Sequence, residues 1–253
     1  MMPGMPYKIK FIQTRKLEGV NHFHHYLCRQ LKGGGMEIFM QDKNIKVKDV
    51  CKCFGKTQVL NHVNMECNQG EITGIIGRNG AGKTVLFKII CGLLSLDSGE
   101  IVINGTKREK QADVLPSVGI IIEEPAFLKN YSGIKNLEYL YMINNKNNRP
   151  YLESIMDKVG LDPKSKKHVG KYSMGMRQRL AIAQSIMEEP DFLVLDEPFN
   201  GLDNHGVDEM RELFLELKKS GKIILIASHN SEDINILCDH VYSMESGNLE
   251  AVR

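Results

Sequence analysis

The residues "GRNGAGKT" at positions 77–84 have the types and the spacing that bind the phosphate groups of a nucleotide. They fit the pattern G-x-x-x-x-G-K-[ST], after "EITGIIG", which predicts a buried strand, and at the start of "KTVLFKIICG", which predicts a helix. The three glycines allow backbone conformations that point N–H groups at phosphate oxygens, and the helix N-terminus adds positive potential. Lys83 can then reach the β- and γ-phosphates, and the Thr84 hydroxyl can ligate Mg²⁺. The alternative, a glycine-rich turn with a chance Lys-Thr pair, leaves the flanking strand and helix unexplained.

A pair of carboxylates follows a second apolar stretch. "FLVLDEP" places Asp196 and Glu197 at the carboxyl end of a predicted strand, and Pro190 ends the helix before it. In a parallel sheet, the carboxyl ends of the strands lie along the ligand-binding crevice. There Asp196 can hold Mg²⁺ through water, and Glu197 can face the water that attacks a phosphate. Two acidic residues after a strand often form only a solvated turn, but the phosphate motif upstream favours the catalytic interpretation.

The elements that must position these groups can be followed along the chain. "IKVKDV" and "VNMEC" alternate apolar and polar residues and predict half-buried antiparallel strands, and "SGEIVINGTK" predicts a hairpin closed near Asn104 and Gly105. Residues 124–172 carry helix signals and polar loops, which predict a helical insertion. A helix after Ser173, the strand "FLVL", a helix over 207–219 and the strand "KIILIAS" follow. The pattern predicts an α/β fold: a parallel-sheet core that carries the phosphate motif, an antiparallel β subdomain and a helical insertion.

Composition limits the classes of function. Of the 253 residues, 42% are hydrophobic and 25% are charged, which is an ordinary balance for a globular chain. The net charge of +2 gives no electrostatic case for binding nucleic acid or an anionic membrane surface. No apolar run reaches the roughly 18 residues that a bilayer span needs, so any membrane work would require another subunit. The six cysteines lack the spacing of a disulfide framework or a zinc site, and we expect reduced thiols in a cytosolic chain.

Residues 1–35 differ from the rest. They show no sustained hydrophobic period, are basic, and lack the apolar core of a secretion signal. The histidines of "HFHH" (His22, His24 and His25) have no nearby cysteine or carboxylate to complete a metal site, which favours a solvated tail. The codons for Lys-Gly-Gly-Gly before Met36 could hold a ribosome-binding site. We therefore hypothesise that residues 1–35 are an unstructured or non-native leader and that the domain runs over 36–253.

The stretch "YSMGMRQRLA" at positions 172–181 indicates a second binding motif. Ser173 is a good N-cap for the helix that follows, and one apolar face explains the helix itself. Packing does not explain Gly175, whereas a Ser-x-Gly entry presents a hydroxyl and free N–H groups to an anion. The longer stretch "YSMGMRQRLAIAQSIMEEPDFLVLDEPFNGLD" resembles the signature motif, Walker B motif and D-loop of ATP-binding cassette (ABC) proteins. The usual signature is Leu-Ser-Gly-Gly-Gln, of which this chain keeps the serine and the second glycine. The resemblance covers residues 45–250.

The resemblance implies a role for each matching residue. Phe54 would stack on the adenine of ATP, although a lone phenylalanine after a strand is more often a core residue. Glu123 falls where most of the family has the Q-loop glutamine, and either acts on Mg²⁺ together with Thr84 and Asp196 or points to solvent. The implied catalytic residues are Lys83, Glu197 and the switch histidine, His229. The implied ATP contacts are Phe54, Gly77, Arg78, Asn79, Gly80, Ala81, Gly82, Lys83, Thr84, Val85, Ser173 and Gly175. Gly201, Leu202 and Asp203 match the D-loop.

The resemblance also implies partners. It predicts a head-to-tail dimer, with a second copy or a paralogue, that encloses two ATP molecules. Each ATP would lie between residues 77–84 of one chain and Ser173 and Gly175 of the other. The work would pass to an integral membrane permease, docked beside residues 123–131, with the chain peripheral at the cytoplasmic face of the membrane.

The variants "IEEP" and "YSMGMRQRL" are similar to those of bacitracin and lantibiotic exporters. We therefore expect an ATPase that drives export of a peptide antibiotic or another toxic amphiphile. The alternatives are an ABC subunit for a different cargo, a soluble translation or DNA-repair ABC protein, and a P-loop kinase. Soluble relatives carry two cassettes or a long coiled coil, and a kinase would not need the signature. The sequence leaves open the cargo, import against export, and homodimer against heterodimer.

Overall fold

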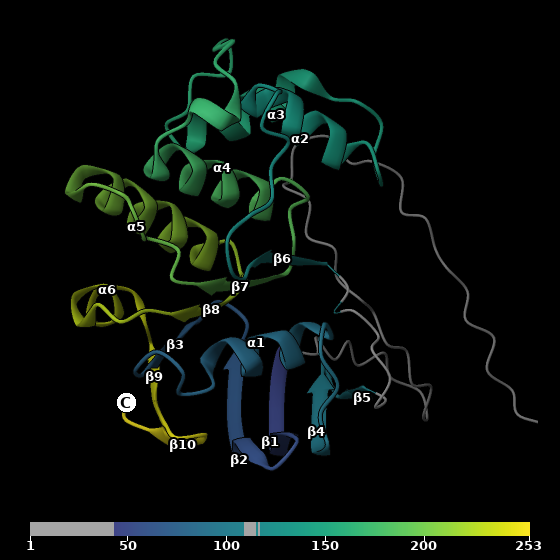
Figure 1. The fold of residues 1–253 in the computed structure, drawn as a ribbon, viewed down its shortest axis with the longest axis vertical. Coiled ribbons are helices and arrows are strands. Elements are labelled where there is room, and N and C mark those ends of the chain that lie inside the picture. Colours follow the sequence, from purple (N-terminus) through teal and green to yellow (C-terminus); the bar gives the residue numbers. More distant parts are fainter. Residues whose placement is uncertain (1–42, 109–114, 116) are drawn as a thin grey trace, which may run out of the picture. The chain divides into compact units, whose positions relative to one another are not determined.

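The computed structural model describes residues 43–108, residue 115 and residues 117–253. The hypothesised leader over residues 1–35, with its histidine cluster, lies outside the described residues. Within them the chain forms two sheets and the helices that cover them (Figure 1).

The larger sheet has the strand order β10-β9-β3-β8-β7-β6. Its strands are β3 (Ile72–Ile76), β6 (Val118–Ile121), β7 (Phe192–Asp196), β8 (Ile223–Ala227), β9 (His240–Glu245) and β10 (Asn248–Ala251). All neighbouring pairs are parallel except β9 and β10. Ala227 is paired with both Ile75 and Asp196, so the carboxyl ends of β3, β8 and β7 lie level. The predicted parallel core is confirmed.

The smaller sheet is antiparallel, with the order β2-β1-β4-β5. Its strands are β1 (Asn44–Phe54), β2 (Thr57–Asn68), β4 (Ser98–Ile103) and β5 (Thr106–Arg108). Alternate residues of β1 and β2 are buried, as the sequence pattern predicts. The β4–β5 hairpin turns at Asn104 and Gly105, whose φ angles of 50° and 76° suit the type I′ turn expected there.

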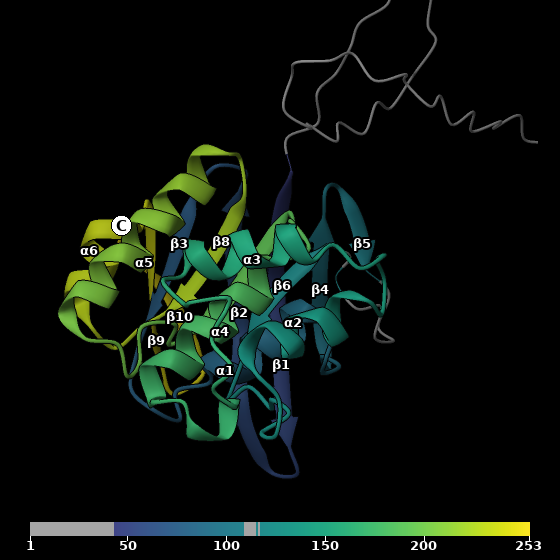
Figure 2. The same ribbon diagram turned by 90° about the horizontal axis from the view of Figure 1, so that it is seen from above.

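Helices cover both faces of the larger sheet. They are α1 (Lys83–Cys91), α2 (Gly133–Tyr141), α3 (Arg149–Lys158), α4 (Met174–Ile186), α5 (Asn204–Lys219) and α6 (Ser231–Leu237), with a 3-10 turn, η1 (Val169–Lys171). One apolar core lies between the sheet and α2 to α6, and the other lies between the sheet, α1 and the strands β1 and β2. Figure 1 shows α4 and α5 on the opposite side of the sheet from α1, and Figure 2 shows α2 and α3 beside α4. Strand β7, which ends at Asp196, therefore packs against both cores, one on each face of the sheet.

The helix ends follow the expected chemistry, with one difference. Gly92, with a φ of 78°, ends α1 as the sequence predicts. The helix predicted over 207–219 begins earlier, at Asn204, because the Asp203 side chain accepts a hydrogen bond from the Gly206 N–H and caps it. Asp203 of the D-loop therefore has a structural role in its own chain. No helix among the described residues has the length and apolarity that a bilayer span requires.

A carboxylate joins the starts of β3 and β9. Asp239 Oδ2 accepts from the Ile72 N–H at 2.8 Å, and Oδ1 accepts from Lys218 Nζ at 2.5 Å. Partial burial acts to raise the pKa of Asp239, but these two hydrogen bonds outweigh it, so the pKa lies below its ordinary value of 3.8. The ionised form of Asp239 therefore stabilises the fold.

The five cysteines among the described residues are free thiols. Burial raises the pKa of the buried thiols to about 12. These are Cys67, Cys91 and Cys238.

Candidate nucleotide-binding site

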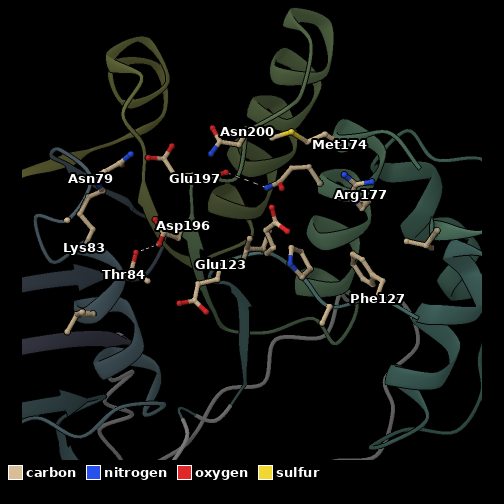
Figure 3. Close-up of a pocket in the computed structure, with 18 of the residues that line it drawn as sticks. Asn79, Lys83, Thr84, Glu123, Phe127, Met174, Arg177, Asp196, Glu197 and Asn200 are labelled. Carbon is tan, nitrogen blue, oxygen red and sulfur yellow. Dashed lines mark hydrogen bonds between the residues drawn. The ribbon is translucent and has the colours of Figure 1, made fainter. Parts of the chain in front are cut away.

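A cavity of about 1030 Å³ lies where the segments after β3, β6 and β7 meet α4. Figure 3 shows Asn79, Lys83 and Thr84 on one side of it and Met174 and Arg177 on the other. The predicted site residues that line it are Asn79, Gly80, Gly82, Lys83, Thr84, Val85, Glu123, Asp196 and Glu197. The topology brings these distant residues together because parallel strands present their carboxyl ends at one edge of the sheet.

The phosphate motif forms the loop between β3 and α1. Gly82 is the N-cap residue of α1 and has a φ of 114°. No side chain caps this helix, so no side-chain acceptor occupies the N–H groups of its first turn. A Cβ at Gly82 would lie 2.9 Å from the Val59 carbonyl oxygen, a second reason for glycine there. Lys83 is only 6% exposed, and its Nζ donates to the carbonyl oxygens of Gly77 at 2.6 Å and Arg78 at 3.2 Å. The loop thus gathers N–H groups and an ammonium, an arrangement suited to phosphate.

Two of the predicted metal ligands are in direct contact. Thr84 Oγ1 donates to Asp196 Oδ2 at 2.6 Å, which joins the first turn of α1 to the end of β7. A hydroxyl and a carboxylate are hard oxygen donors that suit Mg²⁺. Among the described residues, no group of three or more His, Cys, Asp and Glu could hold a metal by itself. The pair fits Mg²⁺, an ion that usually takes one or two carboxylates from a protein and would take other ligands from phosphate groups and water.

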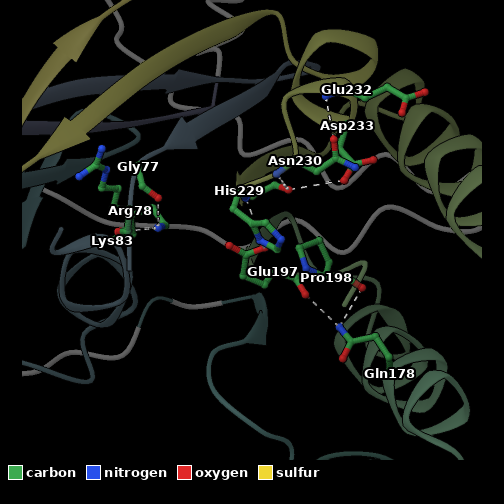
Figure 4. Close-up of polar contacts among 11 residues, drawn as sticks. Gly77, Arg78, Lys83, Gln178, Glu197, Pro198, His229, Asn230, Glu232 and Asp233 are labelled. Carbon is green, nitrogen blue, oxygen red and sulfur yellow. Dashed lines mark hydrogen bonds and ion pairs between the residues drawn. The ribbon is translucent and has the colours of Figure 1, made fainter. Parts of the chain in front are cut away.

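Glu197 and His229 form a second contact beside the cavity. His229 Nδ1 lies 2.8 Å from Glu197 Oε2, and the His229 backbone N–H donates to the same oxygen at 3.4 Å (Figure 4). Glu197 has a φ of 50°, and its backbone N–H donates to the Ala227 carbonyl, which ties the end of β7 to β8. Its other oxygen, Oε1, is buried and has no hydrogen-bond partner within the described part of the chain. Glu197 lines the cavity, and its carboxylate keeps an unused acceptor oxygen, which suits a general base.

Glu123 contacts a lysine, a partner that the sequence analysis does not foresee. Lys88 of α1 places its Nζ 2.5 Å from Glu123 Oε1. Glu123 lines the cavity, yet 65% of its side chain is exposed. The exposure that the alternative expects is therefore present, and action of Glu123 on the metal stays a prediction.

The signature segment is held by its own chain. Ser173 caps α4, as predicted, by accepting from the Met176 N–H at 3.2 Å. The expectation that packing does not explain Gly175 is wrong, because a Cβ there would lie 2.7 Å from the Gly201 carbonyl oxygen. Gln178 Nε2 donates to the Pro198 carbonyl at 2.8 Å, next to Glu197.

Phe54 ends β1 and is 49% exposed, so the alternative that it is a core residue is wrong. Lys52 Nζ lies 5.5 Å from the centroid of its ring. The ring is thus available for stacking, but Phe54 does not line the cavity.

Other predicted residues also lie outside the cavity wall: Gly77, Arg78, Ala81, Ser173, Gly175 and His229. The sequence analysis assigned no role to several residues that do line the cavity, among them Lys129, Met174, Arg177, Gln178 and Asn200. Met174, Arg177, Gln178 and Asn200 lie within the stretch 172–203 that resembles the family motifs, and Lys129 lies within the segment 123–131. Their positions therefore carried a signal, although no role was assigned to the individual side chains.

Comparison with known proteins identifies relatives. The family model described as ABC transporter matches residues 60–200. The bacitracin transport ATP-binding protein BcrA of Bacillus licheniformis is 40% identical over 207 residues, which cover 81% of this chain and 68% of that protein. The lantibiotic transport ATP-binding protein SrtF of Streptococcus pyogenes is 38% identical over 205 residues, which cover 81% of this chain and 88% of that protein.

A solved structure, the dimeric MJ0796, a bacterial ABC transporter cassette, shares the fold. Its TM-score is 0.73 at 21% identity, over 83% of this chain and 99% of that one.

Proposed function

Because this chain belongs to the ABC transporter family as an ATP-binding, ATP-hydrolysing subunit, we propose that it drives the export of a peptide antibiotic or another toxic amphiphile. The observation that carries the proposal is its identity of 40% and 38% to ATP-binding proteins named for bacitracin and lantibiotic transport. Neither bacitracin nor a lantibiotic is assigned as the cargo, since both names describe the relatives.

The roles of the site residues are part of the proposal. Residues 77–85 hold the phosphates of ATP through backbone N–H groups, and Lys83 carries the balancing charge. Thr84 and Asp196, already 2.6 Å apart, would be protein ligands of Mg²⁺, and Glu123 on the same cavity wall is the third candidate ligand. The metal would neutralise charge on the phosphates. Glu197, which lines the cavity and is held at Oε2 by His229, accepts a proton from the attacking water. Phe54 supplies an exposed ring for the adenine.

A second cassette completes each site in this proposal. Ser173 and Gly175 do not line the cavity of their own chain, although they match the family's nucleotide-contacting signature. A partner chain could bring its own copies of both residues to the γ-phosphate. The dimeric arrangement described for MJ0796 supports this assembly. ATP would then act as a ligand that favours the closed dimer.

An integral membrane permease would dock on the segment after Glu123. Exposed apolar side chains follow it on the loop, on α2 and directly after α2: Leu128, Tyr131, Tyr139, Met142 and Ile143. The rings of Tyr131 and Tyr139 are 5.3 Å apart in an edge-to-face contact. A patch of aromatic and long apolar side chains suits the apolar face of a permease loop helix. Such docking would make the chain peripheral to the cytoplasmic face of the membrane.

Glu197→Gln tests the catalytic part. We expect ATP binding to persist and hydrolysis to fall by about 10²- to 10⁴-fold, the usual contribution of a general base. Size-exclusion chromatography with light scattering should find an ATP-dependent dimer in this variant. Hydrolysis at the wild-type rate would exclude Glu197 as the base.

The cargo is tested in a susceptible bacterium that expresses the chain with the membrane subunit that co-purifies with it. The inhibitory concentrations of bacitracin and of a lantibiotic are measured, with a non-peptide antibiotic for comparison. We expect the inhibitory concentration of at least one peptide to rise while that of the non-peptide antibiotic does not. Lys83→Ala, which removes the phosphate contact, is the matched control and should abolish the rise. Equal susceptibility of both strains to every peptide would refute the export proposal.

A further inference from the structure

The contact between Lys88 and Glu123 joins the phosphate-loop helix to the segment after β6. Lys88 lies four residues after Thr84 in α1, so the two side chains share one face of the helix. Its Nζ is 2.5 Å from Glu123 Oε1, and the two residues are 35 apart in sequence. Glu123 has a φ of 64°, a left-handed conformation that is uncommon for a non-glycine residue. The chain turns sharply there and brings the carboxylate back to α1.

Glu123 also lines the cavity that the proposed metal and nucleotide ligands share. Glu123, Thr84 and Asp196 line one cavity, and Thr84 is bonded to Asp196. A carboxylate at this place attracts a divalent cation and repels the phosphates of ATP. Lys88 has the opposite effect on both, because its positive charge opposes the cation and favours the phosphates.

We propose that Lys88 is a positioning residue that acts through Glu123 and sets the Mg²⁺ concentration at which nucleotide binds. Lys88 and Mg²⁺ compete for the Glu123 carboxylate, because a carboxylate paired with an ammonium is a weaker metal ligand. When Mg²⁺ binds the Glu123 carboxylate, the Lys88 ammonium loses its ion pair and can then attract the phosphates of the nucleotide. The inference rests on the proposed function, since it concerns how the same site takes its metal.

The size of the effect follows from exposure. The Glu123 side chain is 65% exposed and that of Lys88 is 32% exposed, so water and salt screen the pair. Measured interactions of such pairs correspond to about a two- to fivefold change in an equilibrium constant. We therefore expect the Mg²⁺ midpoint to move by about two- to fivefold, and less at high ionic strength.

The experiment measures binding without hydrolysis. Isothermal titration with a non-hydrolysable ATP analogue, repeated over a series of Mg²⁺ concentrations, gives the Mg²⁺ midpoint for each variant. Lys88→Gln should lower the midpoint by about two- to fivefold and weaken analogue binding without Mg²⁺. Lys88→Arg, which keeps the charge, should stay near wild type. Lys107→Gln is the matched control, because Lys107 also pairs with a carboxylate, that of Glu100 at 2.6 Å, and neither residue lines the cavity.

The Glu123→Gln background decides whether Lys88 acts through Glu123. In that background, Lys88→Gln should leave the Mg²⁺ midpoint unchanged. An unchanged midpoint in Lys88→Gln alone, or an equal shift in both backgrounds, would overturn the inference. Failure of wild type to bind the analogue at any Mg²⁺ concentration would instead refute the nucleotide site itself.

Discussion

The buried ion pair between Arg211 of α5 and Asp233 of α6 tests how the loop that carries His229 is held. Arg211 donates to Asp233 Oδ1 from Nε at 3.0 Å and from Nη2 at 2.6 Å. Asp233 is 2% exposed and Arg211 is 9% exposed. The other carboxylate oxygen, Oδ2, accepts from Ser228 Oγ at 3.5 Å, and Ser228 Oγ accepts from the Asn230 N–H. The pair therefore supports the residues on both sides of His229 through Ser228, and Figure 4 shows Asp233 near Asn230 and His229.

Asp233→Asn removes the negative charge and nearly conserves the volume. Removing one partner of a buried pair costs about 3–5 kcal/mol, because the other charge stays buried. Arg211 keeps a contact to Asp208 at 3.0 Å, but 67% of the Asp208 side chain is exposed, so it compensates only in part. We therefore expect the free energy of unfolding to fall by about 3 kcal/mol, near the lower limit. For a urea m-value of about 2 kcal/mol/M, the unfolding midpoint falls by about 1.5 M.

Urea unfolding followed by circular dichroism measures the loss. Replacing both members of the pair with apolar residues, Arg211→Met with Asp233→Leu, should recover most of it, because no unpaired charge remains buried. At urea-free conditions, Asp233→Asn should also lower ATP hydrolysis more than ATP binding, since it releases the loop of His229. A loss of stability under about 1 kcal/mol, or a double variant no better than the single one, would refute the account of the pair.

Three further predictions concern the Asp239 carboxylate, the buried thiols and Gly175. The low pKa of Asp239 means that its stabilisation is complete above pH 3.8 and is lost as the pH falls through its folded-state pKa; Asp239→Asn should flatten acid unfolding in that range, as followed by circular dichroism. The buried thiols, with pKa values of about 12, should resist iodoacetamide at pH 8 in the folded protein, whereas exposed Cys53 should react, as peptide mass spectrometry would detect. Gly175→Ala should lower the unfolding midpoint, although alanine usually stabilises a helix by about 1 kcal/mol, because its Cβ would lie 2.7 Å from the Gly201 carbonyl oxygen.

The sequence predicts those parts of the fold whose signals are local. The phosphate loop, the end of α1 at Gly92 and the cap of α4 at Ser173 each depend on a few adjacent residues, and the structure has them where expected. The strands β6 and β10 are only four residues long, and the sequence analysis does not find them. Such short strands carry too few residues for a hydrophobic period, and their place is decided by pairing with β7 and β9.

The candidate site is predictable in its members and less so in its contacts. A family motif can nominate Glu123, but the partner of its carboxylate, Lys88, is decided by how two distant segments fold together. The same holds for Gly175, which the sequence marks as a ligand contact and which the fold also needs against Gly201. The sequence pattern at Gly175 indicates the ligand contact but does not indicate the close packing against Gly201.

Helix α4 connects the two motifs that sequence analysis treats separately. Its N-terminus carries Ser173, while Gln178 of its second turn donates to the carbonyl oxygen of Pro198 at 2.8 Å, directly after Glu197. Gly175 contacts the backbone of Gly201 in the same following segment. A helix held at two points to one loop cannot shift without moving that loop, because packed interiors deform little. Any force on Ser173 therefore reaches the backbone beside the proposed catalytic base of the same chain. If Ser173 binds the nucleotide of a partner cassette, each chain has a direct physical path from the partner's ATP to its own Glu197.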